Sequence, residues 1–372
     1  MAHIAIDARK YFDFGIGSYI QNLISALPEL RSKHTYSLLV APDALQRIPC
    51  PEGWRIHSTS YKRYSLGELM LLGRQARNLG ADIFHEPHYT LPTGLRGRSV
   101  VTIHDLIHLK MPQFFSPAQR MYARTVLGHA VRHAGAVIAI SQKTKDDILE
   151  TFKVPEQNVE VVHLGIRPIF RKLEDHSMVD QFRVGAGLDR PYVLYVGNVK
   201  PHKNIRTLLN AFAQLRTRRN DLDLVFVGGS CKEDRGLSEQ AERLGITGSI
   251  RDLRHISDED LVCAYNGAEV LVLPSLYEGF GYPVLEAMAC GTPTIVSSGG
   301  SLPEIVGAAS LIVDPSRPED LAEALSHVLR DPEMKRDLIA KGKINIQRFS
   351  WRATARKTLD IYEKVLGRWR VN

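Results

Sequence analysis

The feature that most constrains this chain is a repeated alternation of short apolar segments with longer amphipathic ones. The short segments are typical of strands buried on both faces, and the longer ones of helices. Such an alternation predicts a parallel, doubly wound α/β sheet with ligands at the carboxyl ends of its strands. The pattern runs from about residue 4 to residue 163, pauses, and restarts at residue 192. We therefore expect two domains of this class, which 372 residues can accommodate.

The pause between the two series lies at residues 171–190, where charges and glycines precede Pro191. Gly185 and Gly187 are residues that interrupt regular structure, so the sequence predicts a linker here. In the first series we expect a glycine-bearing turn at residues 13–17 and a helix at residues 18–30. A second helix is expected at residues 66–79.

Composition narrows the class of protein. Hydrophobic residues make up 44% and charged residues 24%, as in soluble globular proteins. No segment reaches the roughly 20 apolar residues that span a bilayer, and the start lacks the features of a signal peptide. The four cysteines form no CxxC pair, which argues against a structural zinc site and fits a reducing compartment. We expect a cytoplasmic protein.

The net charge of +7 lies entirely in the first half of the chain. Residues 1–171 hold 21 Lys and Arg against 14 Asp and Glu, and residues 172–372 hold 27 of each. A basic half can face nucleic acid, anionic lipid or an anionic acceptor, or it can be a solvated surface without a partner. Nucleic acid is the least favoured, because no binding motif is present and the basic residues are not interleaved with aromatic ones.

Residues 277–293 combine two kinds of ligand-binding group. Glu278 precedes a glycine-rich turn, and Glu286 lies in the first turn of a helix that Pro283 can begin. Gly279 and Gly281 allow the backbone to approach a ligand closely. The helix start offers N–H donors and a positive dipole end for phosphate, while the carboxylates accept hydrogen bonds from hydroxyls. This combination indicates a sugar nucleotide.

At these residues the sequence resembles the retaining, GT-B-fold glycosyltransferases that use nucleotide sugars, the large group 1 family containing bacterial mannosyltransferases. Glu278 and Glu286, with seven residues between them, carry the resemblance. Residues 195–204 and 102–106 also fit, as does the N-terminal sequence. In the latter, Asp7-Ala8-Arg9 is followed by Gly15-Ile16-Gly17-Ser18-Tyr19.

The resemblance implies the GT-B fold, in which two doubly wound Rossmann-like domains face a central cleft. A C-terminal helix would cross back to the first domain. The acceptor-binding domain would then comprise residues 1–171 and about 355–372. The domain that binds the nucleotide-sugar donor would comprise residues 172–354.

The resemblance also assigns roles in the donor domain. Glu278 would accept hydrogen bonds from hydroxyls of the transferred sugar, which the backbone N–H groups of Gly279, Phe280 and Gly281 would help to hold. Glu286 would accept both ribose hydroxyls, since a carboxylate has two oxygens for a vicinal diol.

The diphosphate would meet N–H groups near Val284 and Leu285, and Lys203 would stabilise its charge as it leaves. Gly197 and Asn198 would line the same site. The family usually has an arginine near position 198. The asparagine found here leaves open which side chain assists Lys203, with Lys200 and His202 as neighbours.

Three more assignments come from the resemblance. The nucleotide base would lie near His255 and Ile256. From the first domain, His104 would line the catalytic cleft near the reacting sugar. Gly15 and Gly17 would let the acceptor or the diphosphate approach, although they can equally form a helix-entry turn.

The implied reaction retains anomeric configuration through front-face attack, with Glu278, Lys203 and His104 as catalytic residues. Neither a cofactor nor a metal ion would be required. The donor would be GDP-mannose or a related GDP-deoxyhexose. The acceptor would be a saccharide or a lipid-linked saccharide of cell-surface polysaccharide such as lipopolysaccharide, handled at the inner face of the membrane. Two alternatives remain open: a sugar-nucleotide epimerase or sugar-phosphate glycosyl synthase of the same fold, and a non-catalytic nucleotide-sugar sensor.

Four histidines suggest a metal site as a further alternative. His85, His88, His104 and His108 have spacings that resemble those of metal ligands. A zincin motif requires its histidines on one helix, and Pro87 would interrupt that helix. We therefore expect these side chains to line the acceptor side of the cleft.

Overall fold

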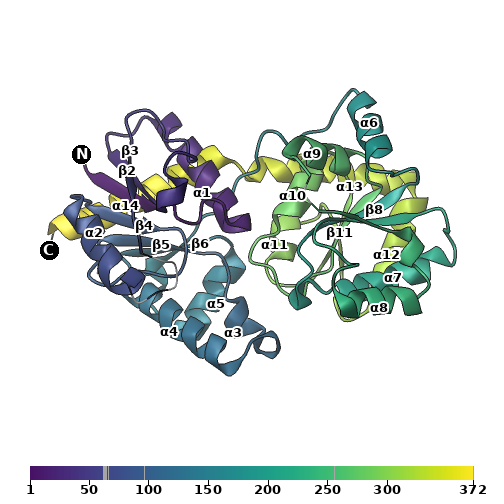
Figure 1. Ribbon diagram of the computed structural model, residues 1–372, viewed down its shortest axis with the longest axis horizontal. Coiled ribbons are helices and arrows are strands. Elements are labelled where there is room, and N and C mark those ends of the chain that lie inside the picture. The colour runs from purple at the N-terminus through teal and green to yellow at the C-terminus, as the bar shows by residue number, and fades with distance from the viewer. Residues whose placement is uncertain (62–64, 66, 96, 255, 372) are drawn as a thin grey trace. The chain divides into compact units, whose positions relative to one another are not determined.

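The computed structural model describes residues 1–61, 65, 67–95, 97–254 and 256–371, which form two compact units (Figure 1). Unit 1 comprises Met1–Gly165 and Phe349–Asn372, and unit 2 comprises Ile166–Arg348. Both boundaries lie six residues before the expected positions 172 and 355. Each unit contains a parallel sheet with helices on both faces, so the predicted fold class is confirmed.

Unit 1 is built on a seven-stranded sheet in the order β3-β2-β1-β4-β5-β6-β7. Its strands are β1 (His3–Asp7), β2 (Thr35–Val40), β3 (Arg55–Ser58), β4 (Ile83–Glu86), β5 (Ser99–Ile103), β6 (Ala136–Ala139) and β7 (Val159–Val161). Nearly all residues of the central strands β1, β4 and β5 are buried, as in strands covered on both faces. The strand order reverses between β1 and β4, where Ile4 lies opposite Ile83. Ligands of doubly wound sheets bind at such a reversal.

Helices cover both faces of this sheet. They are α1 (Phe14–Ala26), the π-helical turn Glu68–Leu72 with α2 (Gly73–Asn78), α3 (Ile107–Lys110), α4 (Pro117–His133), α5 (Gln142–Phe152) and α14 (Trp351–Val371). The C-terminal helix α14 belongs to unit 1 and packs beside α1, as expected. At its start, a Cβ on Gly165 would lie 2.1 Å from the backbone N of Trp351, so glycine permits this close approach.

One local prediction for unit 1 was wrong, and a second predicted helix is present but does not begin as a regular α-helix. The helix expected from residue 18 begins at Phe14, so Gly15 and Gly17 lie in its first turn and not in a preceding loop. Asp13 is extended and its carbonyl already accepts the N–H of Gly17 at 2.6 Å, which starts the helix earlier than the glycines suggest. The helix expected at 66–79 opens with a π-helical turn, and its first residue, Leu66, is outside the described residues.

Unit 2 is built on a six-stranded sheet in the order β10-β9-β8-β11-β12-β13. Its strands are β8 (Tyr192–Gly197), β9 (Asp223–Gly228), β10 (Ile250–Leu253), β11 (Val270–Leu273), β12 (Thr294–Ser297) and β13 (Leu311–Val313). Its helices are α6 (Ser177–Gly185), α7 (Ile205–Arg216), α8 (Arg235–Arg243), α9 (Asp258–Asn266), α10 (Tyr282–Ala289), α11 (Leu302–Val306), α12 (Pro318–Arg330) and α13 (Pro332–Asn345). Here the order reverses between β8 and β11.

The linker predicted at residues 171–190 was wrong. This segment contains α6, which packs on α9 and buries Val179, so it is part of unit 2. The edge strands β10 and β13 were not predicted. β10 contains Arg251 and Asp252 and so lacks an apolar run. β13 is apolar but has only three residues, too few for a clear strand pattern.

Candidate active site

The two loops that carry the predicted donor residues meet where the strand order of unit 2 reverses. One loop follows β8 and the other follows β11, and Leu276 donates its N–H to the carbonyl of His202 at 2.8 Å. Asn204 adopts a left-handed conformation, with φ of 58°. Its side-chain amide donates to the carbonyls of Pro274 (3.1 Å) and Pro315 (2.7 Å). The loop that carries Lys203 is therefore fixed against the loop that carries Glu278.

Lys203 and Glu278 are in direct contact. The ammonium Nζ lies 2.7 Å from Oε1 of the carboxylate, and the side chains are 17% and 12% exposed. Ser275, which sequence reasoning missed, donates its hydroxyl to the same oxygen at 2.6 Å. Among the described residues, no donor is recorded at the other oxygen, Oε2. The carboxylate is thus held by one oxygen and presents a second acceptor for sugar hydroxyls.

The helix α10 begins directly after the Glu278 turn. Gly281, at its N-cap, has φ of 102°, a conformation that L side chains rarely adopt. The turn is held from the next loop, where Ser301 donates its N–H to the carbonyl of Glu278 at 3.0 Å. Val284, one of the two predicted phosphate donors, already donates its N–H to the carbonyl of Gly281 at 3.1 Å. A phosphate at this helix end would have to share the N–H of Val284 with the carbonyl of Gly281. Phosphate binding by Val284 and Leu285 therefore remains a prediction.

Glu286 lies on α10 with its carboxylate against α9. Oε2 accepts a hydrogen bond of 2.8 Å from the hydroxyl of Tyr265, a buried residue that sequence reasoning missed because nothing distinguishes it from a core tyrosine. Burial raises the pKa of Glu286 to about 7, and the Tyr265 hydroxyl and the charge of Arg167 oppose that rise. The predicted contact with both ribose hydroxyls therefore involves a carboxylate with one oxygen already engaged.

The remaining donor residues lie on neighbouring loops. Gly197 ends β8, and the carbonyl of Asn198 accepts the hydroxyl of Tyr195 at 2.6 Å. The side-chain oxygen of Asn198 accepts the N–H of Lys200 at 3.3 Å, so this asparagine shapes its own loop. Ile256 is partly buried in the segment before α9, while the neighbouring His255 is outside the described residues.

In unit 1, His104 follows β5 and bonds to the loop after β4. Its Nε2 lies 2.9 Å from the carbonyl of Pro87, and because a carbonyl only accepts, this nitrogen carries the proton. Burial lowers the pKa of His104 to about 4, so the ring is neutral at pH 7. Its Nδ1 is then a hydrogen-bond acceptor, suited to a substrate hydroxyl. The ring of Tyr19 packs edge-on against it at 5.2 Å.

The glycines of α1 differ in their surroundings. A Cβ on Gly17 would lie 2.4 Å from the carbonyl oxygen of Tyr11, a contact that backbone cannot relieve cheaply. A Cβ on Gly15 would have no atom within 4 Å. Gly17 therefore has a structural reason to be glycine, whereas Gly15 has none in the fold itself.

The histidines considered as metal ligands have protein partners instead. His85 is buried, with Nδ1 2.6 Å from the hydroxyl of Tyr362 and Nε2 2.9 Å from that of Thr102. The ring of His88 packs against that of Tyr89 in a tilted arrangement, with ring centroids 3.8 Å apart. Within the described part of the chain, no group of three or more His, Cys, Asp and Glu side chains is placed to hold a metal ion.

A buried charged cluster lies at the strand reversal of unit 1, and sequence reasoning assigned no role to it. Arg9 is bonded through Nη2 to Asp7 and to Glu68, the latter at 2.6 Å. Glu86, at the end of β4, is buried beside them, and burial together with the charge of Asp7 raises its pKa well above the ordinary range.

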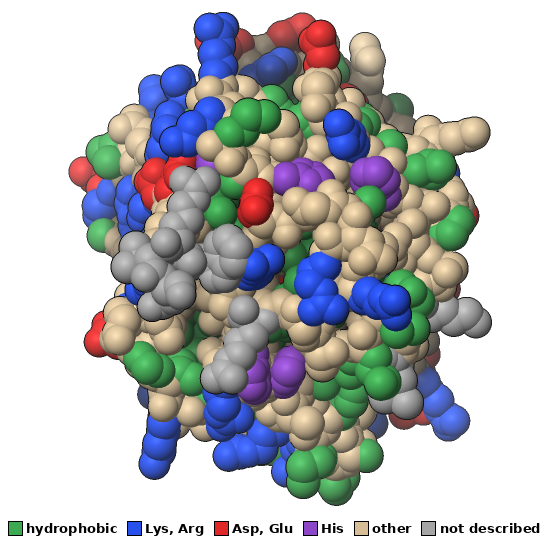
Figure 2. Space-filling model, turned by 90° about the vertical axis from the view of Figure 1, so that its left-hand side faces the viewer, with side chains coloured by type: hydrophobic (Ala, Val, Ile, Leu, Met, Phe, Trp, Pro, Cys, Tyr) green, Lys and Arg blue, Asp and Glu red, His purple; other side chains and the backbone are tan. Residues whose placement is uncertain are grey.

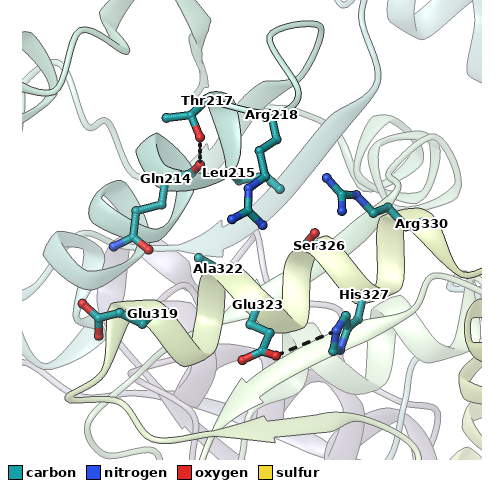
Figure 3. Close-up of a pocket in the computed structure, with 10 residues that line it drawn as sticks. All are labelled: Gln214, Leu215, Thr217, Arg218, Glu319, Ala322, Glu323, Ser326, His327 and Arg330. Atoms are coloured by element: carbon teal, nitrogen blue, oxygen red, sulfur yellow. Dashed lines mark hydrogen bonds and ion pairs between the residues drawn. The ribbon is translucent and has the colours of Figure 1, made fainter.

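A surface groove of about 580 Å³ lies elsewhere in unit 2, between α7 and α12 (Figure 3). Arg218, Arg330 and His327 lie toward one end, and Glu319 and Glu323 come from the first turns of α12. None of the predicted site residues lines this groove, so the candidate site is the loop pair described above.

Comparison with protein families decides the identity of the chain. Residues 179–344 match the family described as glycosyl transferases group 1, and residues 15–169 match glycosyltransferase family 4. The chain is a glycosyltransferase, with a group 1 region in unit 2 and a family 4 region in unit 1. The two matches fall on the two units, and the predicted donor residues between Gly197 and Glu286 lie in the group 1 region.

Similar proteins include bacterial glycosyltransferases. The O-antigen chain mannosyltransferase B of Escherichia coli is 28% identical over 96% of this chain and 98% of its own length. The MMP alpha-(1->4)-mannosyltransferase of Mycolicibacterium hassiacum is 34% identical over 64% of this chain. The chain spans 56% of that relative's length.

Solved structures confirm the GT-B architecture. Sucrose-phosphate synthase from Thermosynechococcus elongatus aligns with a TM-score of 0.79 at 24% identity, covering 99% of this chain and all of that one. WaaG, a glycosyltransferase involved in lipopolysaccharide biosynthesis, aligns with a TM-score of 0.76 at 16% identity, covering 96% of this chain and 99% of that one. At these identities the likeness concerns the fold alone.

Proposed function

We propose that this glycosyltransferase moves a mannosyl or related deoxyhexosyl group from a GDP donor to a saccharide acceptor in the synthesis of cell-surface polysaccharide. The observation that carries the proposal is the Lys203–Glu278 ion pair beside the start of α10, with Glu286 on the same helix. A cation for the diphosphate and two carboxylates for hydroxyls match the parts of a nucleotide sugar. The similarity to the O-antigen chain mannosyltransferase supports the sugar and the acceptor class.

The reaction would retain anomeric configuration. The bond from the anomeric carbon to the donor phosphate oxygen breaks as the bond to the acceptor oxygen forms on the same face. The acceptor proton passes to the departing phosphate oxygen. Lys203 would stabilise the growing negative charge and Glu278 would fix the sugar, so the protein contributes positioning and charge stabilisation. These contributions need no resident metal ion.

We also propose that unit 1 contacts an anionic membrane surface, where lipid-linked acceptors reside. Residues 106–145 contain six Lys and Arg and no Asp or Glu. On α4, Met121 is 66% and Tyr122 39% exposed, and the neighbouring Arg124 is exposed. Figure 2 shows Lys and Arg side chains over one face of unit 1, with hydrophobic side chains between them. Among the described residues, no helix has the length and apolar composition needed to cross a bilayer.

A sedimentation assay tests the membrane contact. The full-length protein should bind vesicles of anionic phosphatidylglycerol and not neutral phosphatidylcholine, with binding weakened by salt. Replacing Arg124 by Gln should weaken it further. Equal binding to both vesicles would contradict the proposal.

The donor is tested by thermal shift with GDP, UDP and ADP, followed by transfer from the matching nucleotide sugar. A ligand that binds the folded state alone stabilises it by about 2.7 kcal/mol at a hundredfold excess over its dissociation constant. We expect GDP to give the largest shift and GDP-mannose to support transfer. Binding without transfer to any acceptor would favour a sensor, and an altered sugar from donor alone would favour an epimerase.

A further inference from the structure

Residues 166–173, at the start of unit 2, are bonded to α9, the helix that contacts Glu286. Asn266, at the end of α9, accepts the N–H of Leu173 at 2.8 Å through its side-chain oxygen. Its side-chain nitrogen donates to the carbonyl of Arg171 at 3.0 Å. Residues 166–173 therefore pack along α9, although they lie about 90 positions before it in the chain.

Arg167 makes an ion pair between this segment and α9. Its guanidinium donates two hydrogen bonds to Asp258, the first residue of α9, at 2.5 and 2.8 Å, and lies 4.8 Å from the ring centre of Phe170. The buried Nε has no hydrogen-bond partner among the described residues. Because Asp258 is 49% exposed, the pair contributes at most a small part of the folding stability. Arg167 is nevertheless held firmly, by two hydrogen bonds to one carboxylate and by contact with an aromatic ring. This arrangement suggests a role other than stabilising the fold.

The contacts continue to the carboxylate. The ring of Phe170 packs edge-on against Tyr265 at 5.8 Å, and the Tyr265 hydroxyl donates to Glu286 at 2.8 Å. Four titratable groups interact electrostatically with Glu286: Arg167 from the segment, Asp258 and Tyr265 from α9, and Cys290 directly after α10. Burial is the largest influence on Glu286 and favours the neutral acid; Arg167 and Tyr265 favour the carboxylate, and Asp258 opposes it.

We infer that Arg167 is a positioning residue of the nucleotide site, which holds residues 166–173 against α9 and keeps Glu286 as a carboxylate able to accept ribose hydroxyls. The inference rests on the proposed function, in which Glu286 binds ribose. Arg167 acts through Glu286 and through Asp258. Without the positive charge of Arg167, the partly buried carboxyl group of Glu286 would hold its proton to higher pH, because Asp258 adds a negative charge nearby.

Two substitutions with opposite expected effects test this role. The affinity for GDP is measured on the full-length protein from pH 5.5 to 8.5, with UDP or ADP if the wild type prefers one of them. The wild type should bind more tightly as pH rises through about 7. Arg167→Gln should raise the midpoint pH of this change in affinity by roughly one unit, and Asp258→Asn should lower the midpoint. Arg167→Lys should keep it near the wild-type position.

A merely structural role predicts a different result. Loss of packing would weaken binding by the same factor at every pH and leave the midpoint unchanged in both variants, which would overturn the inference. Lys335→Gln is the matched control, because Lys335 pairs with Glu269 at 2.6 Å in unit 2 with similar exposure. It should leave the midpoint in place. If Arg167→Gln fails to fold, the downward shift of the Asp258→Asn variant still decides the matter.

The same data separate this inference from the proposed function. Failure of the wild type to bind any of the three nucleotides overturns the proposed function, and the inference with it. Binding with a pH midpoint that neither variant moves overturns the inference alone. A Glu286→Gln variant should remove the midpoint, which identifies Glu286 as the titrating group.

Discussion

Lys203 and Glu278 form a 2.7 Å ion pair although they are 75 positions apart in the chain. They lie on the loops that follow β8 and β11, the two strands between which the sheet order of unit 2 reverses. The pair holds both side chains in place before a ligand arrives. A nucleotide sugar would bring a diphosphate to the cation and hydroxyls to the carboxylate.

Replacing either member of this pair should abolish most of the transfer activity. For Lys203→Ala and Glu278→Ala we expect kcat to fall by about 10²–10³-fold, the cost of removing one preorganised charge at a reacting centre. Transfer of radiolabelled sugar from the donor measures the loss. The melting temperature should change little, since the pair is partly solvated. Near-normal turnover in either variant would refute the site assignment, and Lys335→Ala serves as an ion-pair control.

Glu286→Gln should weaken nucleotide binding without lowering the stability of the fold. Burial raises the pKa of Glu286 to about 7 from an ordinary value near 4.5, so ionisation costs folding stability as pH rises through that window. The neutral variant should therefore be at least as stable as wild type at pH 8, with any advantage vanishing below pH 4.5. Its stabilisation by nucleotide at pH 8 should fall well below that of the wild type and should no longer depend on pH. Chemical denaturation at pH 5 and 8, with and without nucleotide, measures both, and intact nucleotide binding would count against the ribose role.

The two glycines at the start of α1 should respond differently to alanine. Gly17→Ala forces a Cβ to within 2.4 Å of the Tyr11 carbonyl and should cost roughly 1–3 kcal/mol of stability. Gly15→Ala has open space and should leave the fold intact or slightly more stable. If a ligand approaches Gly15, as the family resemblance implies, this variant will lose transfer activity at unchanged melting temperature. Full activity would show that Gly15 is a helix residue only.

His104 should act as a neutral acceptor. Burial lowers its pKa to about 4, so no change in rate between pH 5 and 8 should come from this residue. His104→Ala should lower kcat/KM by roughly 10–100-fold, as for one lost hydrogen bond in the transition state. His104→Asn places an amide oxygen near the position of Nδ1 and should retain more activity. Steady-state kinetics across pH check this prediction. A pH-dependent change in rate that is present in the wild type and absent from the His104 variants would show that His104 acts in its charged form.

Activity should persist in the presence of a chelator. Lys203 and the N-terminus of α10 would supply the positive potential that the departing diphosphate requires. Transfer assays with and without excess EDTA test the expectation. Complete loss of activity that zinc or magnesium restores would contradict it and return attention to the histidines of unit 1.

Several features could be predicted because they depend on residues close together in the sequence. The apolar runs at 192–196 and 268–274 predicted central strands, and β8 and β11 were found there. The spacing of Glu278 and Glu286 placed both on one turn-and-helix element, and α10 confirms the helix. Glu286 is the fifth residue of α10, however, and does not lie in its first turn as predicted. The edge strand β10 was not predictable, because its charged residues show no apolar period. The start of α1 was misjudged because Asp13, not the glycines, sets it.

The sequence by itself determined the fold class and predicted the chemical kind of the site. Strand and helix periods, glycine turns and a helix start are local properties, so they can be recognised without tertiary contacts. The tertiary structure alone decided which side chains share charge and hydrogen bonds. Ser275, Tyr265 and Arg167 are unremarkable in the chain, and they matter because folding brings them to Glu278 and Glu286. Partnerships of this kind depend on distance in space, and the protonation of Glu286 follows from the burial that such packing creates.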